Sequence, residues 1–267
     1  MSMLDPSSLL ARIQGKAQVP GDILLRSTYL DNPLVPNKRG SPIEQDGIRG
    51  FMQTNSIDFT NRGFGDDDIE MVSQALEKRS IIESIYMNGN RLSMLDKRLT
   101  RALAFNHTLK LLWLENNQIY ADGAGRLANA LMLNETIEHV HLGRNSIRDE
   151  GTKRLAEAVQ INQTIKTLDL HHNGIGNIGA EQIADAILIN HSLQSIDLQR
   201  NRIEDIGGRS LTDAVQSNTV ITKLDLSHNP IDRTLQQRVN DILIGPRQLS
   251  MKKQPYERSS LFFCKLM

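Results

Sequence analysis

The chain has 267 residues, and its 31 Lys and Arg residues are balanced by 31 Asp and Glu residues, so its formal net charge is zero. This balance argues against a general nucleic-acid binder, because such proteins carry a clear basic excess. No stretch reaches the roughly 18 apolar residues of a membrane-spanning helix, and the first residues lack the basic and apolar regions of a secretory signal. We therefore expect a cytoplasmic protein that does not bind nucleic acid.

Residues 1–53 contain five of the eight prolines and show no internal repeat. Proline-rich stretches of this kind mark turns and loops. We expect them to form a non-repeat N-terminal arm and cap, with a short helix near residues 7–14.

Asparagines then recur at a fixed interval. A spacing of 28 residues separates Asn117, Asn145, Asn173, Asn201 and Asn229, while Asn90 precedes this series by 27 residues and Arg62 holds the equivalent place before Asn90. We call these positions the landmark positions. A period of this length indicates a solenoid, so residues 54–244 are predicted to form one repeat domain of about seven units.

Each unit begins with a predicted strand. Val140-His141-Leu142 and Ile196-Asp197-Leu198 alternate apolar and variable residues, as a strand with one buried face does. The landmark Asn ends the strand, and its side-chain amide can both donate and accept hydrogen bonds. We expect it to pair backbone groups of the adjoining turns, which would otherwise be buried without partners.

A helix is predicted to follow each strand. Leu155, Ala156 and Val159 show the helical spacing of apolar residues,. Asp149, Asn177 and Asp205 precede a recurring glycine by two positions and are N-cap residue types, which predicts that they cap their own helices. Residues 232–244 are predicted to form the last helix, ended by Gly245-Pro246, and residues 245–267 form a tail.

The combined pattern Leu-x-x-Leu-x-Leu-x-x-Asn-x-Ile, followed by Gly-Ala, Leu-Ala and Ala-Leu-x-x-Asn-x-Thr elements, resembles the ribonuclease-inhibitor-like leucine-rich repeat proteins. That subfamily also includes the Ran GTPase-activating proteins, NOD-like receptor repeats and tropomodulin. The resemblance implies an α/β leucine-rich repeat solenoid, a curved horseshoe with a parallel β-sheet on its concave face and α-helices on its convex face. Its members have many binding roles, so the fold alone does not identify the partner.

Four asparagines match the N-glycosylation acceptor pattern, namely Asn106, Asn134, Asn162 and Asn190,. They also recur every 28 residues at the predicted helix ends. Because Asn suits the left-handed position that follows a helix, capping is the favoured interpretation, with a left-handed backbone at each of them.

Three adjacent units depart from the repeat on the predicted concave face. Four residues before the landmark, where Asp is the default, the chain has Tyr86, Trp113 and His141. Trp113 is the only tryptophan, and a Trp beside a Tyr with an arginine nearby has the composition of an interface hot spot. The alternative is that Trp113 only fills space on the sheet. The predicted partner-binding residues are Tyr86, Trp113, Glu115, His141, Arg144 and His171.

Four histidines raise the question of a metal site: His139, His141, His171 and His172. Zinc sites with three protein ligands exist, but solvated histidines are far commoner, so neither a metal nor another cofactor is expected. The sequence also lacks a nucleophile constellation, a phosphate-binding loop and a metalloprotease helix motif. We expect a protein that is not an enzyme.

The sequence ends in Cys264-Lys265-Leu266-Met267, and Cys264 is the only cysteine. This arrangement fits the prenylation box, in which a terminal Met favours farnesyl, although Lys265 is not aliphatic and chance is the alternative. A single lipid holds a protein only weakly, so a second signal is normally needed, and the basic residues of the tail are a candidate for part of it. The hypothesis is lipidation of Cys264 and peripheral membrane association.

The sequence as a whole favours a monomeric, non-catalytic scaffold that binds a partner protein on the concave face. The resemblance implies two alternatives. One is a GTPase-activating regulator similar to the Ran GTPase-activating proteins, although the long acidic C-terminal run of those proteins is missing here. The other is an actin-binding cap similar to tropomodulin.

Overall fold

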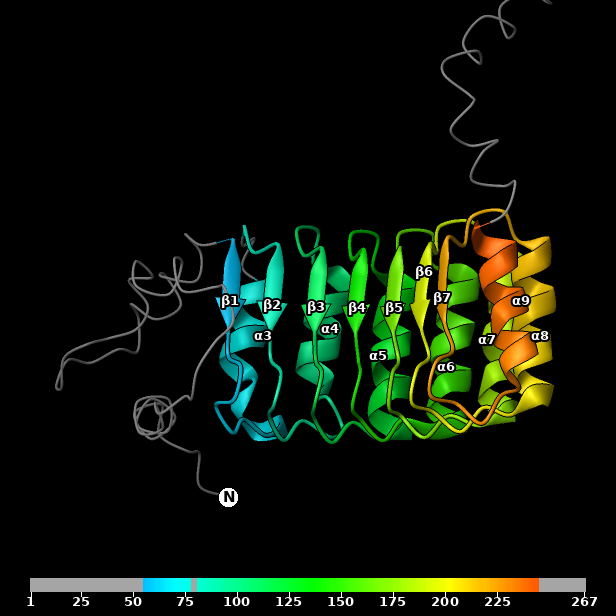
Figure 1. Cartoon of the computed structure of the whole chain (residues 1–267). Helices are drawn as coiled ribbons and strands as arrows, with labels where there is room; N and C mark the ends of the chain where they lie inside the picture. The colour runs from blue at the N-terminus through cyan, green and yellow to red at the C-terminus, as the bar shows by residue number, and fades with distance from the viewer. Residues whose placement is uncertain (1–54, 78–80, 245–267) are drawn as a thin grey trace, which may run out of the picture.

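The computed structural model describes residues 55–77 and 81–244 (Figure 1). The predicted N-terminal arm, the short helix near residues 7–14 and the tail with Cys264 lie outside these residues. Within them the chain repeats strand, turn and helix seven times. No helix in this part of the chain is long and apolar enough to cross a membrane.

The seven strands form one parallel sheet in chain order, and each strand pairs with its sequence neighbours. The register is the same throughout, so equivalent positions of adjacent units lie side by side. We number the units 1–7 after their strands. The strands are β1 (Ser56–Asp58), β2 (Ser84–Tyr86), β3 (Leu111–Trp113), β4 (His139–His141), β5 (Thr167–Asp169), β6 (Ser195–Asp197) and β7 (Lys223–Asp225).

The helices cover one face of the sheet and leave the other open (Figure 1). We call the open side the strand face. Unit 1 begins its helical part with a short 3-10 helix, η1 (Asp66–Asp68). The α-helices are α3 (Glu70–Glu77), α4 (Lys97–Phe105), α5 (Ala121–Leu133), α6 (Arg148–Ile161), α7 (Asn177–Ile189), α8 (Asp205–Ser217) and α9 (Arg233–Ile244).

The core lies between sheet and helices, as the apolar spacing predicts. The middle residue of every strand is buried: Ile57, Ile85, Leu112, Val140, Leu168, Ile196 and Leu224. From the helices, positions such as Leu155, Ala156 and Val159 of α6 meet them. Burial of this continuous apolar layer is the main stabilising contribution, because each unit covers the core of its neighbour.

The landmark asparagines connect consecutive units, as expected. The Asn145 side-chain nitrogen donates to the Leu114 carbonyl of the preceding unit at 3.0 Å and to the Leu142 carbonyl at 2.9 Å. Its oxygen accepts the backbone N–H of Ile119 at 2.9 Å. One buried amide thus satisfies backbone groups of two units.

The asparagines at the helix ends do cap them, but the predicted left-handed backbone is wrong. Asn162 is extended, with φ −70° and ψ 132°. Its side-chain nitrogen donates to Leu131 and Asn134 carbonyls at 2.8 and 2.9 Å, and its oxygen accepts from the N–H groups of Thr164 and Ile165. The extended backbone directs the side chain at the preceding unit, which a left-handed residue would not do.

The helix N-terminal prediction also needs correction. Asp149 lies in the first turn of α6, yet its carboxylate accepts from the N–H groups of Gly176 and Gly179, at the start of α7, at 2.7 and 3.0 Å. Asn177 does the same for Glu204 and Gly207 at the start of α8. These residues therefore cap the next helix rather than their own, which adds a second connection between units.

Candidate protein-binding surface

Three aromatic side chains stack across strands β2, β3 and β4. The register pairs Tyr86 with Trp113 and Trp113 with His141. The ring centroids of Tyr86 and Trp113 are 5.7 Å apart and tilted by 37°, while those of Trp113 and His141 are 4.4 Å apart and nearly parallel. Stacking of this kind contributes stabilisation beyond area burial, so the three rings form one ordered row on the strand face.

Glu115 holds the centre of this row in place. The Trp113 indole nitrogen donates to one carboxylate oxygen of Glu115 at 3.3 Å. The other oxygen lies 3.5 Å from the Arg144 guanidinium and 3.5 Å from the His171 Nε2 atom. Arg144 is exposed over 58% of its side chain, whereas Glu115 is exposed over 27%.

His171 reaches Glu115 across an intervening unit because that unit has a glycine. A Cβ atom at Gly143 would stand 2.1 Å from the His171 ring, so any side chain there would displace the imidazole. Gly143 occupies the position that holds Glu115 in unit 3 and His171 in unit 5. The absence of a side chain in unit 4 thus allows a contact between units 3 and 5.

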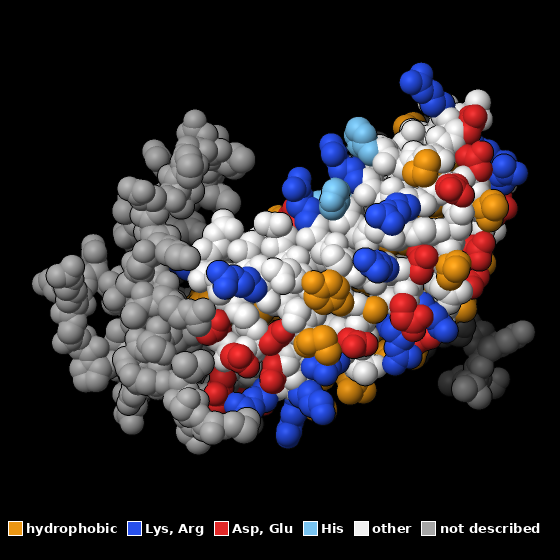
Figure 2. All heavy atoms as spheres, turned by 90° about the horizontal axis from the view of Figure 1, so that it is seen from below, with side chains coloured by type: hydrophobic (Ala, Val, Ile, Leu, Met, Phe, Trp, Pro, Cys, Tyr) orange, Lys and Arg blue, Asp and Glu red, His pale blue; other side chains and the backbone are white. Residues whose placement is uncertain are grey.

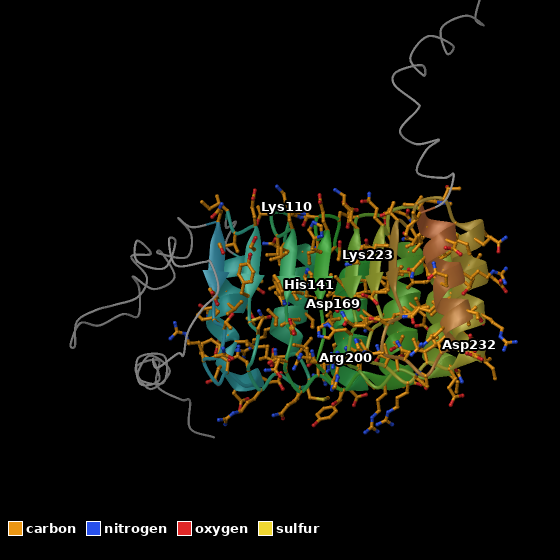
Figure 3. The ribbon with its side chains drawn as sticks, viewed as in Figure 1. Lys110, His141, Asp169, Arg200, Lys223 and Asp232 are labelled. Carbon is orange, nitrogen blue, oxygen red and sulfur yellow. The ribbon has the colours of Figure 1, made fainter. Side chains whose placement is uncertain are left out.

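Asp169 joins the two histidines of the surface. Its carboxylate lies 2.8 Å from His171 Nδ1 and 3.4 Å from His141 Nδ1, and Figure 3 shows His141 and Asp169 side by side on the sheet. Burial alone would raise the pKa of Asp169, but hydrogen bonds from His141 and from the backbone and side chain of His171 outweigh it and lower the pKa,. Only 14% of the Asp169 side chain is exposed.

These contacts form a closed circuit from Trp113 through Glu115, His171, Asp169 and His141 back to Trp113. We call the set the central cluster: Tyr86, Trp113, Glu115, His141, Arg144, Asp169 and His171. All six residues chosen from the sequence belong to it. Asp169 is the residue that sequence reasoning missed, because Asp is the default at its position. His141 on the adjacent strand β4 and His171, two residues later in the same unit, were the signal for it.

Potential metal ligands lie beside the cluster. Donor atoms of Asp169, His171 and Asp197 all lie within 4.8 Å of one another. The Asp169 and His171 atoms already share a 2.8 Å hydrogen bond, and Asp197 accepts from the Gln199 side-chain amide at 2.8 Å. A zinc ion, with ligand distances of about 2.0–2.2 Å, would have to replace those hydrogen bonds.

The other two histidines stand apart from the central cluster. His139 contacts the Thr167 hydroxyl at 3.1 Å. Burial, together with the positive charges of His141 and Lys166, lowers the pKa of His139 against the opposing effect of Glu138. His172 is exposed and has a left-handed backbone, with φ 53°. The structure therefore does not gather the four histidines into one site.

Two cavities in the described part of the chain lie away from the cluster. One lies between β7 and α9 and is lined by Leu224, Val239 and Leu243. The other is next to Arg101 and Phe105 of α4. The central cluster is thus a surface of side chains on a sheet, a shape that suits a macromolecular partner better than an enclosed small ligand.

Comparison with known proteins concerns the repeats. The family model of the leucine-rich repeat matches residues 133–156, 162–184, 190–211 and 217–233. Among solved structures, the tropomodulin C-terminal domain of Caenorhabditis elegans is similar, with 14% identity, 69% of this chain and 96% of that chain covered, and a TM-score of 0.49. The actin-binding site 2 of leiomodin-1 shows 18% identity, 69% and 91% coverage, and a TM-score of 0.45. No curated protein matches the sequence.

Proposed function

We propose, on the premise that the chain is a leucine-rich repeat protein of the ribonuclease-inhibitor-like kind, that it is a non-catalytic scaffold. In this proposal a partner protein binds the concave face of the solenoid, which is the strand face, through the central cluster. The protein acts as a monomer.

The closed ring of contacts in the central cluster is the observation that supports this proposal most. Trp113 is held by Tyr86, His141 and Glu115 at once. A side chain that is already fixed loses little conformational freedom on binding, so more of its contact energy appears as affinity. Trp, Tyr and Arg are also the residue types enriched in interface hot spots.

The same contacts support a non-catalytic role. His171 and Asp169 resemble the base and the orienting carboxylate of a catalytic pair, in which the second imidazole nitrogen faces a nucleophile. Here the second nitrogen of His171 faces the Glu115 carboxylate instead. Both ring nitrogens are thus engaged with carboxylates, and neither is placed to activate a hydroxyl or thiol.

The test is affinity capture from a cell lysate with three forms of the protein as bait: wild type, Trp113→Ala and Gln199→Ala. Gln199 lies on the strand face of unit 6, outside the central cluster, so its variant is the matched control. We expect a partner to be captured by wild type and Gln199→Ala and lost with Trp113→Ala. With the purified partner, Trp113→Ala should weaken binding by about 2 kcal/mol or more, which is roughly thirtyfold.

Thermal unfolding of the same three proteins is the necessary control. Because Trp113 is half-buried on the strand face, we expect its variant to remain folded. If Trp113→Ala unfolds the domain, the residue belongs to the core and the surface interpretation is wrong. Actin polymerisation and GTP hydrolysis by Ran, each measured with and without the protein, test the two alternatives that the sequence raised.

A second part of the proposal concerns membrane attachment. It is supported by the sequence alone, through the box that begins at Cys264,. A eukaryotic cell should attach a farnesyl group to the Cys264 thiol, and Cys264→Ser should shift the protein from the membrane fraction to the soluble fraction. Intact mass spectrometry decides the matter. An unmodified C-terminus in cells with active farnesyltransferase contradicts this part and leaves the scaffold proposal untouched.

A further inference from the structure

A row of cationic and histidine side chains follows the carboxyl ends of the strands. The residue just before each landmark asparagine has a left-handed backbone, with φ between 53° and 58° in Asn116, Arg144, His172, Arg200 and His228. In units 4–7 this position alternates Arg, His, Arg, His. The identical backbone conformation directs these side chains to the same side of neighbouring units.

Two further arginines follow the landmarks of units 4 and 6, namely Arg148, the first residue of α6, and Arg202, which precedes α8. We define the basic rim as Arg144, Arg148, His172, Arg200, Arg202 and His228, all of which are exposed. Figure 2 views the edge at which the strands end and shows Lys, Arg and His side chains gathered along one margin of it. Arg200 lies toward this end of the sheet in Figure 3. The rim is adjacent to the central cluster, because Arg144 belongs to both.

Most of this charge has no acidic partner within the described part of the chain. Arg144 pairs with Glu115 at 3.5 Å, whereas Arg148, Arg200 and Arg202 have no carboxylate within ion-pair distance there. The acidic residues of the same edge, such as Asp149, Glu150 and Asp205, lie in the first turns of helices. Negative charge is stabilised there by the helix dipole, which leaves the basic charge other than Arg148, the first residue of α6, on the margin of the strand face.

We propose that the basic rim binds a short acidic segment of the partner protein, an inference that rests on the proposed function. Adjacent strands are about 4.8 Å apart, so the four rim residues that directly precede the landmarks of units 4–7 span roughly 15 Å, or four to five residues of extended chain. Arginine binds carboxylates with two parallel hydrogen bonds. A neutral histidine can also donate to a carboxylate.

The neighbouring charges favour an acidic protein segment over a nucleic acid. Carboxylates of Glu115, Asp169, Asp197 and Asp225 lie on the strand face beside the rim. They repel a continuous polyanion that enters the face, and the chain has no net positive charge to compensate,. A protein segment can place acidic residues on the rim and neutral or basic ones against the face.

Fluorescence anisotropy tests this inference with labelled probes of known chemistry. The probes are a short peptide of alternating Glu and Ser, its Lys and Ser counterpart, single-stranded DNA of similar length, and vesicles that contain phosphatidylserine. We expect the acidic peptide to bind the wild-type protein best, with an affinity that falls as salt is added, because exposed charges are screened.

Two charge reversals localise the binding. Arg200→Glu changes the rim, and Arg209→Glu changes an exposed arginine of helix α8, so each variant alters the net charge equally. We expect Arg200→Glu to weaken binding of the acidic peptide by about tenfold or more and Arg209→Glu by less than about twofold. Circular dichroism should show both variants folded.

Three results would overturn the inference: an equal loss in both variants, equal binding of the two peptides, or tighter binding of DNA or vesicles than of the acidic peptide. The outcome is separable from that of the proposed function. If Trp113→Ala still abolishes partner capture while the rim fails these tests, only the rim is removed. If Trp113→Ala leaves capture intact, the proposed role of the central cluster in partner binding is wrong as well.

Discussion

The strand face carries two kinds of unit, which differ four residues before the landmark. In units 1, 5, 6 and 7 this residue is an aspartate whose carboxylate accepts the backbone N–H two residues later, at 2.8–3.0 Å. In units 2, 3 and 4 it is Tyr86, Trp113 or His141. The aspartate therefore has a structural role, and the three adjacent units replace it with aromatic rings.

The replacement removes a local hydrogen bond, and the chain compensates in one place. In unit 3 the backbone N–H of Glu115 donates to the Asn88 side chain of unit 2 at 3.1 Å instead. Departures from a repeat's own rule are expected where function requires them. The contrast between units 2–4 and units 1, 5, 6 and 7 thus indicates that the aromatic side chains do not serve to hold the turn.

The largest expected loss of stability is at the landmark of unit 5, the unit that contributes Asp169 and His171 to the central cluster. The landmark of the last unit serves as the comparison. Asn173 is buried and donates to Leu142 and His171 carbonyls, so Asn173→Ala should lower the free energy of unfolding by roughly 1–3 kcal/mol. Asn229 is half-buried in unit 7, and Asn229→Ala should cost less. Urea unfolding measures both, and equal losses would contradict the role of burial.

The second prediction separates structure from binding at equivalent positions. Asp197→Ala removes the acceptor of two hydrogen bonds from Gln199 and should destabilise the domain by about 1 kcal/mol without changing partner affinity. His141→Ala should instead weaken partner binding by about 1 kcal/mol, because it removes the ring stacked on Trp113. The comparison fails if the Asp197 variant loses affinity and the His141 variant does not.

The third prediction concerns the role of Gly143 in positioning His171. An alanine there would displace the His171 ring and break its contact with Glu115. We expect Gly143→Ala to reduce partner affinity by about threefold to tenfold, with a stability change below about 1 kcal/mol because a side chain can rotate away. Gly125→Ala in helix α5 is the control, since its Cβ would meet only Arg154 at 3.7 Å. An equal loss of partner affinity in the Gly125→Ala control would contradict this explanation.

The smallest expected effect concerns acid stability. The pKa of Asp169 is lowered in the folded protein, with hydrogen bonds from His141 and His171 prevailing over the opposing effect of burial. A lowered pKa means that the folded state holds fewer protons, so this stabilisation is present above the unfolded value of about 3.9 and is lost as the pH falls below it. Unfolding midpoints of wild type and Asp169→Asn should therefore converge as the pH is lowered from 5 to 3. A constant difference between them would refute the linkage.

The sequence predicts the fold well because its 28-residue period fixes two things at once. The landmark positions align the units, including the 27-residue step from Asn90 to Asn117, so Tyr86, Trp113 and His141 must be neighbours. The alternation within each strand then assigns these side chains to the open face. The seven strands, the landmark asparagines and the last helix follow from the same period.

The contacts between units are less predictable, since they depend on the direction of a side chain rather than on its position. Asp149 and Asn162 are cap types at helix ends, but both make contacts to a neighbouring unit about 28 residues away. Asp169 has the default residue for its position, and its two histidine contacts come from rotamers and from the space that Gly143 leaves. Periodicity contains no information on either point.

The central claim is that Trp113 lies in the partner interface. Because Trp113 is the only tryptophan, protein labelled with fluorotryptophan gives a single fluorine NMR signal from the middle of the central cluster. Addition of the captured, unlabelled partner should shift or broaden this signal until binding is saturated. A signal that stays unchanged at saturation would contradict the account, because the partner would then bind elsewhere on the molecule.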